Sequence, residues 1–343
     1  MSEDNSALGT CCASCGIAEI DGIKLRECDG CDLVRYCSDA WRELHRPEHA
    51  AMCKKRAAEL RDELLFKQPE SSHHGDCPIC SLPLSLDLSK SSTNTCCSKV
   101  ICKGCVYANR IRAKEMNLFP SCPFCRQPVP NTEREMNERR KIRSKANDPA
   151  AISFAGLEQR EKGNYGIAFA NFTKAAELGH VEAHRQLSIM YELGLGVEQD
   201  EGKAIHHLEE AAIGGHPKAR HNLGVYEWND KNYERAAKHW IIAARLGYNE
   251  SIKELMKMYK VCSSDNFERD IERAIEKAVE SVIAATQEQD NSTKALVEKY
   301  KEKYKTGFVS KEVLDATLRA HKAAVDATKS PQREAAERRF ALP

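Results

Sequence analysis

Beyond residue 148 the apolar positions recur every three or four residues, which is the period of a helix with one buried face. Three successive segments end in an alanine pair followed by a glycine, at Gly179, Gly215 and Gly247. Glycine readily takes the left-handed conformation that ends a helix, so each of these glycines marks the end of a unit. The pattern predicts repeated helix pairs over residues 149–260.

Small side chains occupy equivalent positions in these units. The shared positions are Ala168, Ala204 and Ala236 before the alanine pairs, with Ala183 and Leu187 matching Ala219 and Leu223 in the first helices. Alanines at a helix crossing allow close approach, and each unit can bury its apolar stripe only against its neighbours. From about Ala151 to Tyr259 the chain resembles Sel1-type helical repeats, relatives of the tetratricopeptide array. The resemblance implies an α-solenoid whose concave surface binds a protein partner.

Helical spacing also predicts helices outside the repeats. Residues 1–9 lack the pattern and are expected to be disordered. Residues 261–329 are expected to cap the array, and 330–343 to form a flexible tail because Ser330-Pro331 ends the preceding helix. The expected single helices span residues 54–66, 106–118, 131–147, 267–282 and 309–329. The segments between the modules are a helical linker at 55–72 and a charged linker helix at 131–148.

Composition excludes several classes of partner. The chain of 343 residues carries 52 basic and 51 acidic residues, a net charge of +1 that gives no overall attraction to nucleic acid or anionic membrane. No run of eighteen apolar residues could span a bilayer, and the polar, acidic start from Met1 to Ser6 does not resemble a signal peptide. We therefore expect a cytoplasmic or nuclear protein that takes no small-molecule substrate.

Cysteine content changes this picture, because all but Cys262 of the sixteen cysteines fall in two clusters. In the larger cluster, over residues 73–130, eight cysteines form four close pairs. Two such pairs complete one tetrahedral Zn²⁺ site, so four pairs indicate two sites. Disulfides or buried free thiols are the alternatives, but disulfides need an oxidising compartment.

This larger cluster resembles a RING finger in an all-cysteine variant. The resemblance implies a cross-brace, in which the first and third pairs hold one zinc and the second and fourth pairs hold the other. The implied ligands are Cys77, Cys80, Cys102 and Cys105 for the first ion, and Cys96, Cys97, Cys122 and Cys125 for the second. Lys99 stands where the family often has a histidine ligand, so the adjacent pair Cys96-Cys97 has to supply the missing donor.

Known RING fingers recruit a ubiquitin-conjugating enzyme and form no covalent intermediate, so the resemblance implies no catalytic residue. It does imply a contact surface for that enzyme. Ile79 fits the apolar residue of the first zinc loop, and Pro123 fits the proline of the last pair. Arg126 follows the final cysteine, where a guanidinium could bridge the conjugating enzyme and ubiquitin.

The smaller cluster, over residues 10–54, is similar to a MYND finger, an adaptor that docks short peptides. The resemblance implies two interleaved zinc sites. The first would use Cys12, Cys15 and Cys37, and the second Cys28, Cys31, His49 and Cys53. A segment this short rarely buries enough apolar area to fold alone, so zinc binding would supply folding free energy.

One ligand of the first MYND-like site is missing, because Trp41 stands where the family expects a cysteine. An indole cannot bind zinc. The site could be empty or weak, or His45 or Cys11 could replace the ligand. The cluster is therefore expected to bind one or two zinc ions.

Taken together, the sequence predicts a mainly α, multidomain protein with two zinc-stabilised fingers followed by an α-solenoid. The first functional hypothesis is a RING-type E3 ubiquitin ligase whose repeats and MYND-like finger bind partners or substrates. The alternative is a non-enzymatic scaffold with structural zinc only. Nucleic-acid binding is disfavoured, because neither finger has the strand-then-helix layout of groove-reading fingers.

Overall fold

The computed structural model describes residues 12–14, 25–29, 31, 34–262 and 311–340. The chain divides into two compact units, Met1–Lys67 and Gln68–Pro343. The expectation for residues 1–9 and the helix expected at 267–282 lie outside the described residues.

The first unit combines a two-stranded sheet with one long helix. Strands β1 (Arg26–Glu27) and β2 (Arg35–Tyr36) pair antiparallel, and helix α1 (Asp39–Leu65) follows directly. Its small core contains Cys12, Cys31, Val34 and Tyr36. The helix of the smaller cysteine cluster and the linker helix expected from residue 54 are thus parts of one continuous 27-residue helix.

The second unit begins with a compact region that carries the larger cysteine cluster, which we call the central finger (residues 73–130). Strands β3 (Ser91–Thr93) and β4 (Val100–Cys102) form a hairpin that pairs Ser91 with Cys102. A short 3-10 turn, η2 (Leu88–Lys90), precedes the hairpin, and helix α2 (Lys103–Glu115) follows it. The finger's few buried apolar residues include Leu84 and Ile101.

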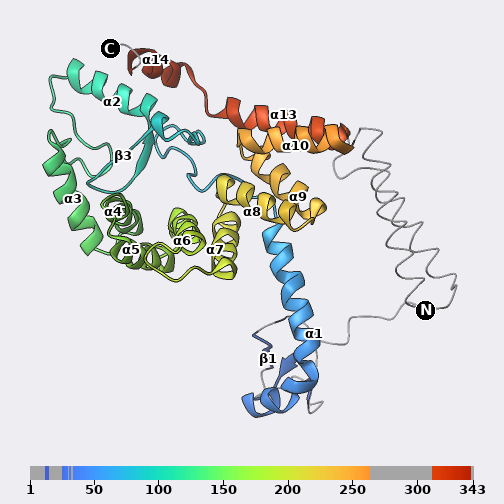
Figure 1. The fold of residues 1–343 in the computed structure, drawn as a ribbon. Helices are drawn as coiled ribbons and strands as arrows, with labels where there is room; N and C mark the ends of the chain where they lie inside the picture. The colour runs from blue at the N-terminus through green and yellow to red at the C-terminus, as the bar shows by residue number, and fades with distance from the viewer. Residues whose placement is uncertain (1–11, 15–24, 30, 32–33, 263–310, 341–343) are drawn as a thin grey trace. The chain divides into compact units, whose positions relative to one another are not determined.

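Helix pairs make up most of the remainder of the second unit (Figure 1). Helix α3 (Glu133–Lys145) matches the expected charged helix, and seven helices follow it without a strand. Their bounds are α4 (Pro149–Glu161), α5 (Tyr165–Glu177), α6 (Val181–Leu193), α7 (Glu201–Ile213), α8 (Pro217–Asn229), α9 (Tyr233–Arg245) and α10 (Asn249–Cys262). The α-solenoid predicted from the sequence is confirmed.

A small residue on the first helix of two units faces a large aromatic residue on the second. A Cβ atom on Gly156 would lie 2.7 Å from the ring of Phe172, and one on Gly224 would lie 2.4 Å from the indole of Trp240. Both aromatic residues are buried. Glycine therefore sets the close spacing of these helix pairs. The repeat-ending Gly179, Gly215 and Gly247 have the positive φ angles of 80°, 80° and 91° that a left-handed helix end requires.

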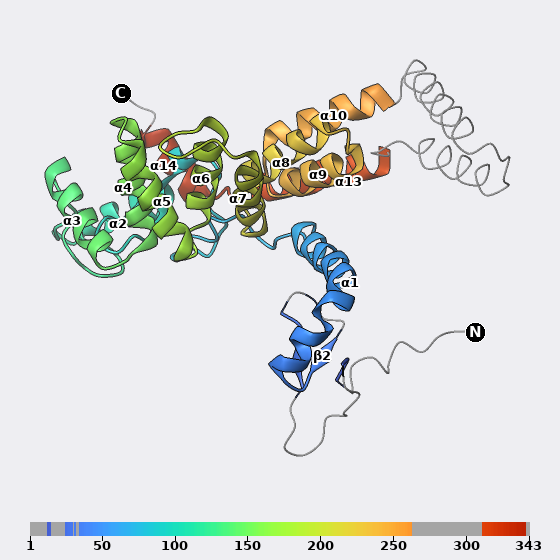
Figure 2. The ribbon, with the colours of Figure 1, turned by 60° about the horizontal axis from the view of Figure 1, so that its bottom comes forward.

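Helix α13 (Lys311–Ala327) packs on the last helices of the array (Figure 2). Leu314 of α13 is buried in one apolar cluster with Trp240 of α9 and Leu255 of α10. His321 adds a polar contact, because its Nδ1 donates to the carbonyl of Ala244 at 2.8 Å. This helix covers apolar surface that the array would otherwise expose, which is what a terminal repeat requires.

The flexible tail expected at residues 330–343 is corrected by the structure, since Pro331–Phe340 forms helix α14. The Ser330-Pro331 pair starts a helix here. The hydroxyl of Ser330 accepts a hydrogen bond from the backbone N–H of Arg333 at 3.2 Å, and proline suits the first helical position. Figure 1 shows α14 beside α2, and Ala336 on it is fully buried.

Candidate metal centres

The first centre of the central finger joins Cys77, Cys80, Cys102 and Cys105, whose sulfur atoms all lie within 4.8 Å of one another. A tight turn presents the first pair: the N–H of Cys77 donates to Leu82 at 2.9 Å, and the N–H of Ser81 donates to Cys77 at 2.8 Å. The second pair stands where β4 ends and α2 begins, and the N–H of Cys105 points at the sulfur of Cys102 at 3.4 Å.

The second centre joins Cys96, Cys97, Cys122 and Cys125. Its last pair sits on a turn bonded like the first, because Cys122 N–H donates to Gln127 at 2.8 Å and Arg126 N–H donates to Cys122 at 2.9 Å. Arg126 has a φ of 58°, as Ser81 has 54° in the matching turn.

The hairpin explains why the pairs interleave. Its connecting loop carries Cys96 and Cys97, while the far end of β4 carries Cys102. One short strand therefore connects the two centres, and its buried Ile101 packs in the apolar cluster around the first centre. The structure groups the eight cysteines in the two sets expected from the sequence.

Sulfur spacing tests whether zinc fits these sets. Cys80 and Cys102 are 3.9 Å apart at sulfur, and Cys97 and Cys122 are 3.7 Å apart. A tetrahedron with Zn–S bonds of about 2.3 Å has edges of about 3.8 Å, whereas a disulfide needs about 2.05 Å. These eight cysteines are all free of disulfides. The donor sets thus fit Zn²⁺.

The first unit holds a third centre, made by Cys28, Cys31, His49 and Cys53. Helix α1 presents His49 and Cys53 one turn apart. Cys28 and Cys53 are 3.7 Å apart at sulfur, and the Nε2 of His49 lies 3.2 Å from the sulfur of Cys31. Three thiolates and an imidazole are a common structural zinc set.

The other predicted site of the first unit is only partly described. Cys12 and Cys37 pack in the same small core, while Cys15 and Cys11 lie outside the described residues. Trp41 falls in the first turn of α1. The Nδ1 of His45 lies 2.9 Å from the hydroxyl of Tyr36.

Comparison with protein families now identifies the modules. Residues 12–53 match the MYND finger, and residues 150–180, 181–216 and 217–248 each match the Sel1 repeat. The chain carries a MYND finger and three Sel1 repeats. Both are protein-interaction modules, and the cysteine and histidine clusters fit zinc. The chain is therefore a zinc-binding protein-interaction adaptor.

Similar curated proteins match only part of the chain. Protein SHC1 of Saccharomyces cerevisiae is 42% identical over 62 residues, which cover 18% of this chain and 12% of SHC1. The chitin synthase regulator SKT5 of the same organism is 31% identical over 118 residues, or 31% of this chain and 16% of SKT5. The crystal structure of a Sel1 repeat protein from Oxalobacter formigenes matches 46% of this chain and 63% of its own, with 20% identity and a TM-score of 0.33.

Metal binding has to displace protons from several of the cysteine thiols. Burial, followed by contacts with Cys28 and Cys31, raises the pKa of Cys53 to about 12. Burial and neighbouring thiols also raise the pKa of Cys96 and of Cys105. These groups carry protons at neutral pH until a cation displaces them, so metal affinity falls as pH falls.

The residues expected to contact a conjugating enzyme all reach the surface. Ile79 is 43% exposed, and Pro123 and Arg126 are exposed on the matching turn. Two further apolar residues of the finger, absent from the sequence predictions, also reach the surface: Phe119 is 92% exposed and Phe124 is 36% exposed. The available signal in the sequence was one phenylalanine within the last cysteine pair and another three residues before it. Among the described residues no helix is long and apolar enough to cross a membrane.

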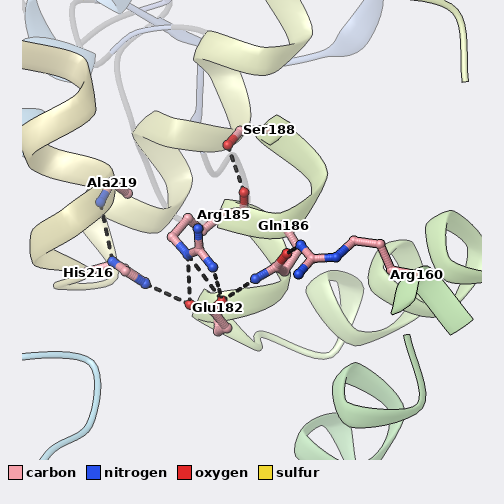
Figure 3. Close-up of polar contacts among 7 residues, drawn as sticks. All are labelled: Arg160, Glu182, Arg185, Gln186, Ser188, His216 and Ala219. Carbon is pink, nitrogen blue, oxygen red and sulfur yellow. Dashed lines mark hydrogen bonds and ion pairs between the residues drawn. The ribbon is translucent and has the colours of Figure 1, made fainter. Parts of the chain in front are cut away.

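A further polar cluster, absent from the sequence predictions, joins residues 73–74 to the Sel1 repeats. Glu182 at the start of α6 accepts from Arg185, Gln186 and His216, the last at 2.7 Å (Figure 3). These donors keep the pKa of the carboxyl well below its usual range although burial opposes ionisation.

Histidine rings complete this cluster. The ring of His73 stacks on that of His216 with centroids 4.0 Å apart and planes 13° from parallel. The backbone N–H of His73 donates to Gly215 at 3.0 Å. Parallel rings cannot aim both nitrogens at one ion, and three donors already surround Glu182. This arrangement is a structural joint between the central finger and the repeats.

Proposed function

We propose that the central finger is a RING-type finger that recruits a ubiquitin-conjugating enzyme, and that the adaptor is an E3 ubiquitin ligase. The observation that carries this proposal is the interleaving of four cysteine pairs in two four-sulfur sets. Two such centres, one at each end of β4, would hold the turn of Ile79 and the turn of Pro123 in a fixed relation. The finger itself would supply no nucleophile.

Surface chemistry supports the same reading. The exposed Ile79, Phe119 and Phe124 give the finger apolar surface that no described element covers. Exposed apolar side chains of this size on a small domain are typical of protein contacts. Arg126 adds an exposed cation beside the last cysteine. A guanidinium there could donate to both the conjugating enzyme and ubiquitin.

The Sel1 repeats would select the partner or substrate. A cavity of about 540 Å³ lies on the array, lined by Glu192, Gln199, Glu201, Asn222, Val225, Tyr226 and Asn229. Burial, with Glu192 beside it, raises the pKa of Tyr226 to about 12, so this hydroxyl stays a donor. The carboxylate and amide side chains that line this cavity favour an extended, basic segment of a partner protein. The carboxylates can bind its cationic side chains, and the amides can form hydrogen bonds with its backbone.

Ubiquitylation in vitro tests the ligase proposal. Zinc-loaded protein is incubated with ubiquitin, the activating enzyme and a panel of conjugating enzymes, and chain formation is followed. At least one conjugating enzyme should support chains. Ile79→Ala should abolish them while zinc content stays unchanged, and Ile142→Ala, which truncates a 65% exposed side chain on α3, is the matched control.

A second variant tests the charge of Arg126 without disturbing the turn that carries it. Arg126→Asn removes the charge but suits a backbone with a φ of 58°. It should slow chain formation without loss of zinc. If the full panel stays inactive with metal-replete protein, the scaffold interpretation replaces the ligase interpretation.

A further inference from the structure

The C-terminal helix makes close contact with the central finger although more than two hundred residues separate them. Gln332 donates to the carbonyl of Gly104 at 3.1 Å, and Lys90 pairs with Glu337 at 3.0 Å. A Cβ atom on Gly104 would lie 2.9 Å from the Cγ of Arg333 and 3.0 Å from its Cα. Gly104 follows the zinc-ligand position Cys102 by two residues, so α14 rests on the start of α2 beside the first centre.

Arg333 is the residue of α14 that enters the finger, and it is only 7% exposed. One terminal nitrogen, Nη1, donates to the carbonyls of Pro83 at 2.7 Å and Thr328 at 2.6 Å. The other, Nη2, donates to the carbonyl of Leu82 at 3.1 Å and to the sulfur of Cys80 at 3.4 Å. The guanidinium thus spans the turn that presents the first cysteine pair.

The groups around the Arg333 guanidinium show which negative charge it balances. Its hydrogen bonds in the described structure go to three carbonyls and one sulfur, and none goes to a carboxylate. A buried cation is costly unless an anion faces it. Four thiolates around Zn²⁺ carry a net charge of −2, and Cys80 is one of the four. The assembled centre is therefore the counter-charge of Arg333.

We propose that Arg333 is an outer-sphere partner of the first zinc centre, and that this contact makes docking of α14 and metal retention by the finger depend on each other. Arg333 neutralises part of the thiolate charge and donates to a ligand sulfur, which stabilises the loaded centre. In return the loaded centre holds α14, and with it the end of the helix that caps the Sel1 repeats. Such coupling is reciprocal by thermodynamic necessity.

This linkage closes the second unit into a loop. The finger leads into the array, the array into α13, and α13 through three residues into α14, which returns to Cys80. Loss of metal from the first centre would release the C-terminal end of the array. The finger, α14 and the end of α13 would then respond together to zinc supply or thiol oxidation. The inference needs only the zinc centre and stands whether or not the finger recruits a conjugating enzyme.

Metal-release measurements on the full-length protein test the proposal. Arg333→Met keeps the bulk of the side chain but removes its charge and its N–H groups, and Arg333→Lys keeps the charge without the planar fork. Arg338→Met, at an exposed position of the same helix, is the control. Removal of an outer-shell partner typically lowers metal affinity by about 10- to 100-fold. In a chelator titration, Arg333→Met should therefore lose one zinc per chain at a chelator concentration about tenfold lower than the unmodified protein does. The shift should be smaller for Arg333→Lys. Arg338→Met should release zinc as the unmodified protein does.

A spectroscopic readout separates this role from simple packing. Cobalt(II) is substituted for zinc, and the sulfur-to-metal charge-transfer band is recorded for each variant. Loss of an N–H donor and a nearby cation raises the energy of the sulfur electrons, so the difference spectrum of Arg333→Met should show a shift to longer wavelength. Arg338→Met should match the unmodified protein.

Hydrogen exchange measures the reverse direction of the coupling. Cys80→Ser removes the sulfur that Arg333 contacts, and the amides of α14 should then exchange faster while those of α5 and α7 stay protected. The proposal is overturned if Arg333→Met leaves the charge-transfer band and metal retention unchanged. It is equally overturned if Cys80→Ser leaves the protection of α14 intact.

Discussion

The central finger and the Sel1 repeats lie in the same unit of the molecule, yet different physics holds each together. The finger has few buried apolar residues beyond Leu84 and Ile101, and eight cysteines gather around two points. The array has continuous apolar clusters built from alanine, leucine and aromatic side chains, with no cysteine in them. The finger therefore depends on its metal ligands, and the array depends on the packing of its apolar side chains.

This difference determines how each region tolerates change. A ligand set fails as a whole when one donor or the metal is lost, because its folding free energy comes from the ion. A repeat core loses stability in proportion to the volume removed, since each unit contacts only its neighbours. The contrast makes separate predictions for metal removal, for truncation of the array core and for acid.

Metal removal should give the largest effect. A strong chelator at neutral pH should unfold the MYND finger and the central finger, while most of the helical circular-dichroism signal remains, because none of the described cysteine ligand sets lies in α4 to α10. Hydrogen exchange read by region is the matching measurement. Collapse of the helical signal in parallel with zinc release would contradict the separation drawn here.

Core truncation in the array should have a smaller effect that does not depend on metal. Phe172 is fully buried against Gly156, so Phe172→Ala should lower the free energy of unfolding of the array by about 3–5 kcal/mol. The control Ile167→Ala, at a 58% exposed position of the same helix, should change it by no more than about 0.5 kcal/mol. Denaturant unfolding with and without chelator measures both. A loss for Phe172→Ala that appears only in the zinc-loaded protein would be evidence against independent cores.

The histidine joint should produce the smallest effect, and only in acid. Burial lowers the pKa of His73 to about 2, with His216 and His74 adding repulsion and Glu182 opposing the shift. A base whose pKa is lowered on folding contributes stability above its unfolded pKa of about 6.5, and that contribution falls as pH drops below this value. One proton gives a slope of at most about 1.4 kcal/mol per pH unit.

The variant His73→Gln isolates this contribution, because it keeps a polar side chain that does not titrate. Hydrogen exchange of residues 71–75 is compared at pH 7.5 and pH 5.5 in both proteins. After correction for the slower intrinsic exchange in acid, protection of these amides should fall more in the unmodified protein than in the variant. Equal acid sensitivity in the two proteins would assign the effect to the thiol ligands, which also take up protons in acid.

Local spacing was sufficient to predict the repeats and to mark the two cysteine clusters as candidate zinc sites, whereas the grouping of the distant pairs came from the resemblance to RING and MYND fingers. The three glycines at the unit ends and the alanine positions mark the helix pairs, because helix periodicity and helix ends depend on neighbouring residues. Cysteine pairs identify metal sites in the same way, since two close thiols already define half of a tetrahedron. The MYND finger and the Sel1 repeats could therefore be recognised before any coordinates were known.

Only the tertiary structure brought together residues that are distant along the chain. The Ser330-Pro331 pair predicts a helix end as readily as a helix start, and the surface of α2 decided in favour of α14. Arg333 reaches Cys80, and His73 stacks on His216, although no periodicity links either pair. Such contacts depend on where the array returns to the finger, because packing of whole helices fixes that position and the sequence pattern of a single segment does not.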